Sequence, residues 1–557
     1  MMIKKEISEL IVEALRKIGT ETSREILVEE SADPKFGDYN SNIAMTFKGT
    51  ENREQRTATP KEFAEKIIKN LPENEIIEKA EVAGPGFINF WVSKKYLQNE
   101  LQNITEAGES YGENDSGKGE KVLVEFISAN PTGPMHIGNA RGGPLGDIIA
   151  EVLKKTGHKV EREFYVNDIG RQARLFGESV LARIKGEELP KDGYPGEYVK
   201  DLAKKISKKI DKKNEDVNKL TIVSLSTLAI GEMVKGMKET ATKMGIEYDN
   251  FKYESEYLNA GKTEAIIKEL TEKGNTKINE GALWFMGKPS RALASEGKSK
   301  FLEDRECVLE RSKGGGYTYF ANDIAYHQDK FERGFDRLID VWGANHFGHI
   351  PRMKEAMAAL DHDPKKLEIV LYQYVQLKEE GIVKKMAKRE GTYVTADEVL
   401  GLVSKDVFRM MMIMTAPNSH LEFDLKLAQE QSKKNLVFYV QYAYARICSI
   451  LAKAVNSEQG TENRYDGLTH ETEIALQKEL IKFPDLVSDV AQNYEVQRLP
   501  FYAIELSKKF HRFYKSCRVL QAETEELKNA RLALTGAARI VLKNTLDLMG
   551  IEAPERM

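Results

Sequence analysis

One stretch, from Val122 to Val166, constrains the fold of this chain most strongly. A short apolar run opens it and predicts a buried strand, and a loop punctuated by proline and glycine follows. Apolar residues then recur at helical spacing before a second strand-like run over residues 159–166: Leu145, Ile148, Ile149, Val152 and Leu153. Gly157 occupies the position of a C-terminal helix cap. Strand, helix and strand in this order predict a βαβ unit and therefore a parallel sheet.

The loop before the predicted helix has the chemistry of a phosphate site. A helix N-terminus carries partial positive charge and unpaired N–H groups, and glycines at 138, 142 and 143 let the backbone approach a ligand closely. His136, just before the helix, can donate to a phosphoryl oxygen, and the loss of one such donor typically costs ~3 kcal/mol of barrier. An isolated His-x-Gly is more often a turn with one core histidine, so the neighbouring residues decide.

Those neighbours are specific. The run SANPTGPMHIGN, residues 128–139, resembles the HIGH motif of class I aminoacyl-tRNA synthetases. With Glu125, Asn130 and Gly133 it is similar to the arginyl-tRNA synthetase version, although Asn139 stands where the general motif has histidine. The resemblance implies a catalytic His136, ATP contacts from Gly133, Gly138 and Asn139, and arginine contacts from Glu125 and Asn130 at the α-amino end.

A second segment, residues 316–327, supplies a different kind of site. Tyr319 and Asp323 are four residues apart at a loop-to-helix junction and can face one pocket. A guanidinium group needs a planar wall and a carboxylate that accepts two hydrogen bonds. In the family, the matching tyrosine and aspartate hold the substrate side chain. Asp323 can also be explained as a helix N-cap. We favour a binding pocket, because this segment and the one with Glu125 and Asn130 together supply the groups that an arginine ligand needs.

The apolar run from Leu338 to Trp342 predicts another core strand, followed by a turn with glycine and histidine. Gly343 leaves room for a flat base or ribose at the edge of an open α/β sheet, and we expect His346 to contact adenosine. Asn345 replaces the aspartate usual in the family and is expected to contact arginine. His346 and His349 have no third ligand in view, so we expect no zinc or other protein-bound metal.

A lysine-rich loop between Gly381 and Gly391 follows the strand-like run over residues 367–377. Alone, its spacing of two lysines would indicate a solvated loop. Paired with the loop at His136, it resembles the KMSKS motif that completes class I synthetases. Lys385 and Lys388 take the two lysine positions and Met386 the ATP-contacting position. Such lysines can offset charge as pyrophosphate leaves.

Both ends of the chain add RNA-related resemblances. Residues 34–45 and 83–92 resemble the N-terminal domain of arginyl-tRNA synthetases, which contacts the D-loop corner of tRNA in that family. From about residue 430 three apolar stripes at helical spacing predict a helical bundle. The run from Phe438 to Arg446 resembles the anticodon domain, and Tyr442 and Arg446 are its candidate anticodon contacts.

Bulk properties restrict the remaining choices. Basic and acidic residues nearly balance, 83 against 87, so RNA contacts must come from local patches. The three cysteines are widely spaced, which excludes a disulfide scaffold and suits a reducing compartment. No apolar run reaches the ~20 residues of a membrane helix.

Asp168, after the second predicted strand, has two possible roles: it can cap the next helix, or it can be a catalytic group.

We therefore expect an α/β chain with a Rossmann-like parallel-sheet core. The predicted domains are an N-terminal α+β domain (1–115), a catalytic domain (116–425) with a helical insertion at about 190–280, and an all-α anticodon-binding domain (426–557). The predicted activity is that of an arginyl-tRNA synthetase with the partners ATP, Mg²⁺, L-arginine and tRNA(Arg). The chain is expected to act as a cytoplasmic monomer without a membrane contact.

Three alternatives stay open from the sequence. Another class I synthetase would share both loops. A nucleotidyltransferase that needs no tRNA would use the same core to activate another carboxylate, although the long helical C-terminal part argues against it. A non-catalytic RNA-binding paralogue is the third, and the intact His136, Lys385 and Lys388 speak against it.

Overall fold

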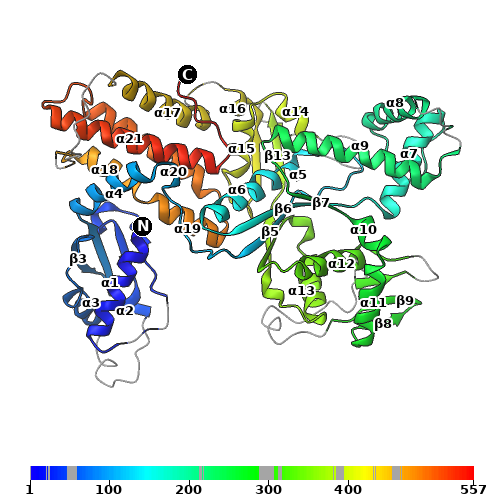
Figure 1. The fold of residues 1–557 in the computed structure, drawn as a ribbon, viewed down its shortest axis with the longest axis horizontal. Helices are drawn as coiled ribbons and strands as arrows, with labels where there is room; N and C mark the ends of the chain where they lie inside the picture. The colour runs from blue at the N-terminus through cyan, green and yellow to red at the C-terminus, as the bar shows by residue number, and fades with distance from the viewer. Residues whose placement is uncertain are drawn as a thin grey trace.

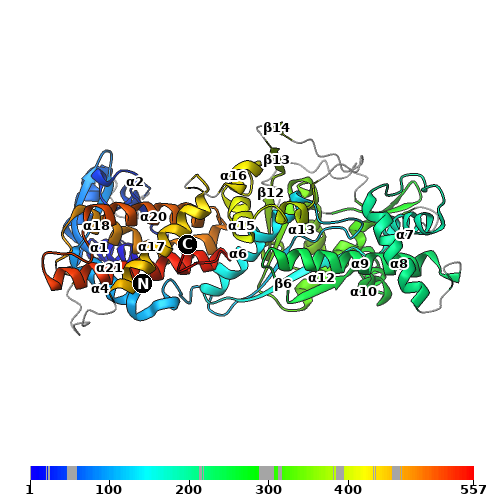
Figure 2. The same ribbon diagram turned by 90° about the horizontal axis from the view of Figure 1, so that it is seen from above.

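The computed structural model has an elongated shape in which a central sheet separates two helix-rich ends (Figures 1 and 2). It describes residues 2–20, 22, 25–46, 59–212, 216, 219–287, 307–311, 316–379, 382–383, 394–430, 432, 434–454, 465 and 467–557. The N-terminal domain and the C-terminal helical bundle occupy one end, and the helices that follow β6 and β7 occupy the other (Figure 1).

The predicted βαβ unit is confirmed and forms the centre of a five-stranded parallel sheet. The strand order is β12-β11-β5-β6-β7, and Glu125 of β5 pairs in register with Glu163 of β6 and Asp340 of β11. Gly146 of the intervening helix needs to be glycine, because a Cβ there would lie 2.3 Å from Cγ of Phe126. The strands are β5 (Lys121–Phe126), β6 (Lys159–Val166), β7 (Asn250–Tyr253), β11 (Arg337–Gly343) and β12 (Leu367–Tyr372).

Helices cover both faces of this sheet. The crossover from β5 to β6 runs through two consecutive helices, and Gly157 takes a positive φ of 84° just after the second, as a C-terminal cap requires. The helices of this central region are α5 (Ile137–Ala140), α6 (Gly142–Lys155), α7 (Gly170–Lys185), α8 (Glu197–Lys212), α9 (Ile222–Lys243), α10 (Glu254–Asn259), α11 (Lys262–Glu272), α12 (Tyr319–Glu332) and α13 (His349–Ala359).

Two sequence-based expectations in this region were wrong in detail. The run over residues 367–377 is two strands, because the chain turns at Gln373, whose N–H donates to the carbonyl of Pro417. The second strand, β13 (Val375–Glu379), joins a separate sheet with β14 (Ile382–Val383) and β15 (Leu421–Asp424). Within the Lys/Glu-rich helical stretch, β7 completes the core sheet. Residues 282–285 lie outside that sheet, in an antiparallel one formed by β8 (Thr276–Asn279), β9 (Ala282–Phe285) and β10 (Val308–Glu310).

The N-terminal domain is a four-stranded antiparallel sheet packed against helices. The predicted amphipathic first helix is confirmed, and its apolar stripe of Ile3, Ile7 and Ile11 is fully buried. The elements are α1 (Ile3–Lys17), β1 (Glu29–Glu30), β2 (Tyr39–Ser41), α2 (Ile43–Thr46), α3 (Pro60–Lys69), β3 (Ile77–Ala83), β4 (Phe87–Val92) and α4 (Lys94–Ala107).

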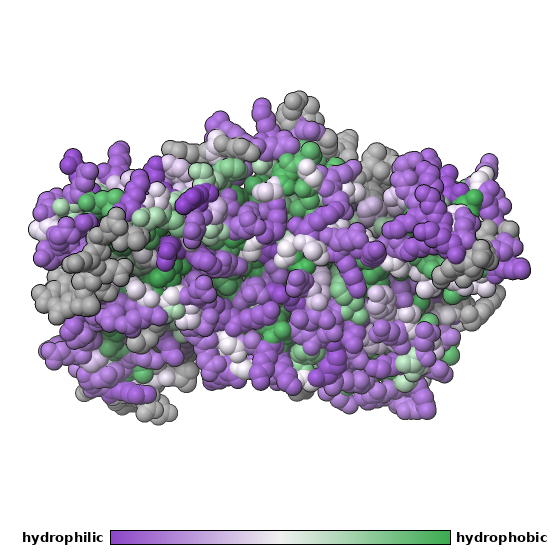
Figure 3. Space-filling view, turned by 45° about the horizontal axis from the view of Figure 1, so that its top comes forward, coloured by the Kyte–Doolittle hydropathy of each residue, from purple (hydrophilic) through white to green (hydrophobic). Residues whose placement is uncertain are grey.

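The C-terminal part of the chain is helical, as predicted. The three apolar stripes form α17, α20 and α21, and two further helices lie between the first and the second. The helices after the core are α14 (Ala396–Leu400), α15 (Lys405–Ile413), α16 (Leu425–Gln429), α17 (Leu436–Lys453), α18 (Glu471–Leu480), α19 (Phe483–Asn493), α20 (Arg498–Ser516) and α21 (Glu525–Leu548). Among the described residues, no helix is both long and apolar enough to cross a membrane, and the view in Figure 3 is mainly hydrophilic.

One buried arginine joins the bundle to the core. Arg409 of α15 is completely buried, and its guanidinium pairs with Asp147 of α6 at 2.6 Å. It also donates to the carbonyls of Met549 after α21, at 2.6 Å, and Met244 after α9, at 2.9 Å. Because one rigid guanidinium holds α6 and the C-terminal ends of α9 and α21 at once, the bundle and the core have a fixed relation at this point.

Polar contacts join the N-terminal domain to the bundle. Lys4 of α1 pairs with Asp489 of α19 at 2.7 Å, and its backbone N–H donates to Asp485 at 3.3 Å. Lys478 and Lys482 pair with Asp38 and Glu30 of the N-terminal domain, each at 2.7 Å. Asp485 is buried, and burial raises the pKa of its carboxyl to about 7, although Lys4 opposes the rise.

This raised pKa predicts a pH-dependent stability. Between about pH 4 and pH 7 the unfolded chain ionises Asp485 while the folded chain keeps it protonated, so its contribution to stability falls as the pH rises. Asp485→Asn removes that loss. Relative to the unchanged protein, the variant should gain up to about 4 kcal/mol between pH 4 and pH 8, measured by urea unfolding.

The matched control for this prediction is Asp547→Asn, which removes an exposed ion pair with Lys543 on α21 of the same bundle. It should show no such gain with pH. A difference between Asp485→Asn and the unchanged protein that stays constant from pH 4 to pH 8 would contradict the prediction.

Candidate active site

A cavity of about 440 Å³ lies at the carboxyl ends of β5 and β11, where an open parallel sheet binds its ligands. Its walls come from the loop after β5, the start of α12, the turn after β11 and the turn between β12 and β13. The structure brings most of the predicted site residues to this one cavity: Glu125, Asn130, Gly133, His136, Gly138, Asn139, Tyr319, Asp323, Gly343, Asn345 and His346.

The imidazole of His136 has a defined orientation. His136 is the N-cap of α5, and its Nδ1 accepts a hydrogen bond from the backbone N–H of Asn139 at 3.1 Å. A neutral ring in this arrangement carries its proton on Nε2, so it is a hydrogen-bond donor there. Gly138 preserves the arrangement, because a Cβ at that position would lie 3.0 Å from Nδ1.

The loop after β5 begins with unusual backbone geometry. Ile127 and Ser128 both have positive φ, 68° and 38°, although neither is glycine. The hydroxyl of Ser128 accepts a hydrogen bond from the N–H of Tyr165 at 3.1 Å, which ties the turn to β6. Strained conformations of this kind persist where the surrounding structure enforces them, and they concentrate at functional sites.

The lysine loop, with Lys385, Met386 and Lys388, lies outside the described residues, but its C-terminal flank is described and lies beside His136, which lines the cavity. The N–H of Ile137 donates to the carbonyl of Val394 at 3.1 Å, and the N–H of Ala396 donates to the carbonyl of Met135 at 2.8 Å. Residues 394–396 therefore run beside His136. The segment that leads into the loop is also close, because Gln373 and Tyr374 line the cavity.

Arg141, near the start of α6, connects the turn between β12 and β13 to residues 415–419. Its fully buried guanidinium donates to the carbonyls of Gln373 and Ser419, each at 2.8 Å, and to those of Thr415 and Ala416 at 3.2 and 3.0 Å. Burial lowers the pKa of Arg141 to about 10, so it remains a cation at neutral pH. Within the described residues no carboxylate forms an ion pair with it, so its positive charge is uncompensated near the cavity.

Tyr319 and Asp323 lie one turn apart on α12, and both line the cavity. The alternative that Asp323 is the N-cap is wrong, because α12 starts at Tyr319 and the Thr318 hydroxyl caps it. Asp323 is 6% exposed, and its carboxylate contacts Nε2 of His349 at 3.0 Å. Tyr319, 46% exposed, stands nearer the mouth.

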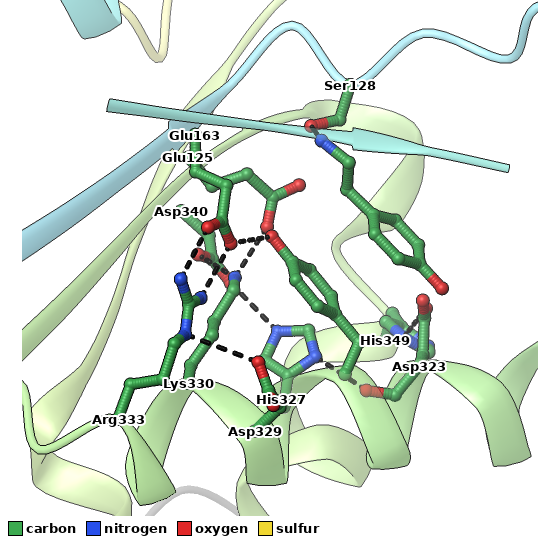
Figure 4. Close-up of polar contacts among 12 residues, drawn as sticks. Glu125, Ser128, Glu163, Asp323, His327, Asp329, Lys330, Arg333, Asp340 and His349 are labelled. Atoms are coloured by element: carbon green, nitrogen blue, oxygen red, sulfur yellow. Dashed lines mark hydrogen bonds and ion pairs between the residues drawn. The ribbon is translucent and has the colours of Figure 1, made fainter. Parts of the chain in front are cut away.

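Behind the cavity, three carboxylates stand in a row across the sheet. Glu163, Glu125 and Asp340 are register partners on β6, β5 and β11, and all three are buried. Cations three residues apart along α12 face them (Figure 4). Arg333 binds Glu163 through two nitrogens at 2.6 and 2.8 Å. We call these three carboxylates, with His327, Lys330 and Arg333, the charge row.

Two carboxylates of the charge row, Glu125 and Asp340, share one cation, Lys330. Nζ of Lys330 lies 2.5 Å from Glu125 and 2.7 Å from Asp340. Nε2 of His327 contacts Asp340 at 2.9 Å, and its Nδ1 contacts the backbone carbonyl of Asp323 at 2.8 Å. His327 therefore connects Asp340 of β11 to the backbone of α12.

A further carboxylate that sequence reasoning missed is Glu254 at the start of α10. It is buried and accepts hydrogen bonds from Asn167 at 3.1 Å and Asn322 at 2.6 Å. Burial raises its pKa to about 7, and Asp323 adds to the rise. Its signal in the sequence is weak, because Glu254 is one acid among several between residues 247 and 256.

One further expectation, that Asp168 caps the next helix, is corrected by the geometry. Asp168 does not cap the helix that follows it, since the N-cap of α7 is Ile169. Instead its carboxylate accepts hydrogen bonds from the N–H and the hydroxyl of Ser255, at 2.9 and 2.6 Å, and so holds the start of α10. His349 contacts Asp323. In the described part of the chain no three His, Cys, Asp or Glu side chains are grouped as metal ligands.

Tyr442 and Arg446 lie elsewhere, on α17 of the helical bundle. The Arg446 guanidinium stacks 4.7 Å from the Tyr442 ring and 5.5 Å from the Tyr514 ring of α20. Tyr442 is 37% exposed and Tyr514 40% exposed, so this cluster presents aromatic faces and a cation to solvent.

Comparison with known proteins gives consistent results along the whole chain. Three family models match: the arginyl-tRNA synthetase N-terminal domain over residues 5–92, the catalytic domain of class I tRNA synthetases (R) over residues 100–424, and the DALR anticodon binding domain over residues 440–557. These matches favour an arginyl-tRNA synthetase over the other class I synthetases.

Individual relatives agree with the family models. The chain is 42% identical over 572 aligned residues to the arginine–tRNA ligase of Caldanaerobacter subterraneus subsp. tengcongensis, with 100% of this chain and 99% of that protein covered. The corresponding ligase of Heliobacterium modesticaldum is 40% identical, with the same coverage.

A solved structure supports the fold. The arginyl-tRNA synthetase of Thermus thermophilus superposes with a TM-score of 0.78 over the full length of both chains, at 23% identity. The predicted membership of the family is thus confirmed by full-length relatives, and this chain belongs to the arginyl-tRNA synthetase family of class I.

Proposed function

We propose that this chain activates L-arginine with ATP and transfers it to the terminal adenosine of tRNA(Arg), with the cavity at the ends of β5 and β11 as the active site. The observation that carries the proposal is the position of two carboxylates, Glu125 and Asp323, in the same cavity as His136 and its helix N-terminus. One end of the cavity thereby suits a cationic amino acid, and the other suits phosphate.

Arginine would lie between β5 and α12. Its guanidinium would meet the Asp323 carboxylate, held by His349, and the ring of Tyr319 would form the planar wall. Its α-ammonium would meet Glu125, with Asn130 and Asn345 nearby in the cavity wall. Glu254 lies behind this wall and adds negative potential when it ionises near neutral pH.

ATP would lie against the loop at His136, as its magnesium complex. Gly343 and His346 would border the adenosine, while Gly133, Gly138 and Asn139 would border the phosphates. The buried cation of Arg141, which forms no ion pair in the described part of the chain, supports this placement, because it adds positive potential beside the α5 N-terminus. Met386, outside the described residues, is proposed as a further contact to ATP.

The first reaction is attack of an arginine carboxylate oxygen on the α-phosphorus, with release of pyrophosphate. The Nε2 proton of His136 would donate to a phosphate oxygen as charge builds up there. Lys385 and Lys388 would neutralise the departing pyrophosphate. In the second reaction a ribose hydroxyl of the terminal adenosine attacks the activated carbonyl, and AMP leaves.

The RNA would extend over three proposed domains, 1–115, 116–425 and 426–557. Tyr442 and Arg446 are proposed anticodon contacts, because exposed aromatic rings beside a cation suit unstacked bases. The N-terminal domain, packed on the bundle, would meet the D-loop corner. A monomeric, cytoplasmic enzyme completes the proposal, and analytical ultracentrifugation with and without tRNA tests the monomer.

The direct test of the function is aminoacylation with each of the twenty amino acids and total tRNA. Only arginine should be esterified, and only to tRNA(Arg). Charging of another amino acid would contradict the assignment. Adenylate formation without any RNA would indicate a tRNA-independent nucleotidyltransferase, and no reaction at all would indicate a non-catalytic RNA-binding protein.

Asp323→Asn should impair the use of arginine selectively. The change keeps the shape but removes the charge that faces the guanidinium, so kcat/KM for arginine should fall by roughly 100-fold, while KM for ATP stays within about twofold. Steady-state aminoacylation with each substrate varied in turn measures both.

Glu332→Gln is the matched control, because Glu332 is on the same helix but is exposed and accepts a hydrogen bond from Gln328 at 3.0 Å, outside the cavity. It should leave the arginine parameters nearly unchanged. Equal effects of Asp323→Asn on arginine and on ATP would mean that Asp323 has only a structural role.

Lys388→Ala should lower kcat far more than it raises KM for arginine. The charge that Lys388 is proposed to neutralise develops as pyrophosphate leaves, so its interaction is stronger in the transition state than with bound substrate. A decrease in kcat of about 10²-fold or more is expected, measured by single-turnover kinetics with saturating arginine. Unchanged turnover would remove the lysine loop from the mechanism.

A further inference from the structure

The charge row contains a buried cation, Lys330, that contacts neither proposed substrate. Its side chain is completely buried on α12, and its Nζ lies between the carboxylates of Glu125 and Asp340, 2.5 and 2.7 Å away (Figure 4). Glu125 also lines the cavity, whereas Lys330 does not. Among the described residues that line the cavity, Glu125 is the one with which Lys330 forms an ion pair.

The sheet itself makes this lysine necessary. Glu125 and Asp340 are directly paired residues of two neighbouring central strands, so their side chains leave the same face of the sheet at the same level. Like charges directly opposite one another destabilise a sheet, and burial makes the repulsion stronger. Lys330 is the cation that separates them.

We propose that Lys330 is a positioning residue for the arginine site, which keeps Glu125 ionised and aimed at the substrate α-ammonium. The inference rests on the proposed role of Glu125. The inference explains how Glu125, which is buried and beside Asp340, can hold a negative charge.

Without Lys330, Asp340 would still have a basic partner, whereas Glu125 would not. Asp340 would retain His327, 2.9 Å away. Glu125 would lose the one basic group that forms an ion pair with it in the described part of the chain. Burial already raises the pKa of Glu125, which Lys330 opposes and Asp340 increases. The proton that the site would take up should therefore bind to Glu125.

Every other charged or titratable group facing Glu125 leaves this conclusion intact. Glu163 is neutralised by its two contacts with Arg333, and burial raises the pKa of the tyrosines around it, which stay neutral. The groups are Asp340 from β11, Glu163 and Tyr165 from β6, His327, Lys330, Tyr326 and Tyr319 from α12, and Tyr248 before β7.

The test is Lys330→Met, which removes the charge with little change in volume. Burial without a cation raises the pKa of a glutamate, so in this variant Glu125 should be mostly protonated at pH 7. KM for arginine should rise at least roughly tenfold at pH 7, and the ratio of variant to unchanged protein should fall several-fold between pH 7 and pH 8.5, because each pH unit raises the ionised fraction of a protonated carboxyl by up to about tenfold. KM for ATP should change by less than about threefold.

Three further variants separate this role from a structural one. Asp340→Asn added to Lys330→Met removes the competing carboxylate and should recover about tenfold of the lost affinity at pH 7. Lys330→Arg keeps the charge and should keep KM within about fivefold. Lys262→Met removes another ion-paired lysine, the partner of Asp329 at 2.7 Å, and should leave KM for arginine unchanged.

Glu125→Gln distinguishes failure of the inference from failure of the proposed function. If Glu125→Gln leaves KM for arginine unchanged, the assignment of Glu125 to the α-ammonium is wrong. If Glu125→Gln raises KM but the Lys330→Met ratio is the same at pH 7 and pH 8.5, the positioning role of Lys330 is wrong.

Circular dichroism melting of every variant shows whether it is folded. Should Lys330→Met fail to fold, the double variant and Lys330→Arg decide the question. For the double variant, the ratio of its KM for arginine to that of the unchanged protein must fall between pH 7 and pH 8.5. For Lys330→Arg, KM for arginine must stay within about fivefold of the unchanged value. Failure of either overturns the inference.

Discussion

The row of three carboxylates on β6, β5 and β11, neutralised by Arg333, Lys330 and His327, is the interaction on which the active site depends. It fixes the position of α12 across the central sheet. The same helix carries Tyr319 and Asp323 at its start, so the ion pairs that hold its second half also position the wall of the proposed arginine pocket. Buried charges of this kind cost desolvation energy and stabilise little by themselves. Their value here is geometric, because each contact specifies one strand and one helix turn.

The part of the cavity proposed to bind phosphate is organised by backbone contacts. Residues 394–396, just beyond the lysine loop, hydrogen-bond to Met135 and Ile137 on either side of His136. Arg141 gathers four carbonyls from two further segments. A site assembled in this way presents donors to the phosphates without rearranging them at the moment of reaction, which is how electrostatic stabilisation of a transition state becomes effective. Arg409 extends the same construction, because it connects the helix behind the His136 loop to the end of the C-terminal bundle.

The sequence was sufficient wherever the determining interactions are local. Helical periodicity predicted α1, α6, α17, α20 and α21, and the βαβ pattern predicted the parallel sheet. The loop at His136 was identified because its glycines and histidine are contiguous. The sequence was insufficient where partners are distant: Glu125 and Lys330 are 205 residues apart. No local pattern distinguishes Lys330 from a surface lysine, and the division of residues 367–377 into two strands depends on a hydrogen bond from Gln373 to Pro417. In retrospect, cations at 327, 330 and 333 beside apolar helix positions were a signal.

Carboxylates at both ends of one pocket are proposed to select a substrate with two positive groups. Citrulline tests this selection most directly, because it has the shape of arginine and the same α-ammonium but a neutral ureido group. The measurement is the ratio of kcat/KM for arginine and for citrulline in tRNA charging by the unchanged protein. A site that requires a buried ionic partner should prefer arginine by about 10⁴-fold. A preference of less than about tenfold would contradict a charged guanidinium site at Asp323.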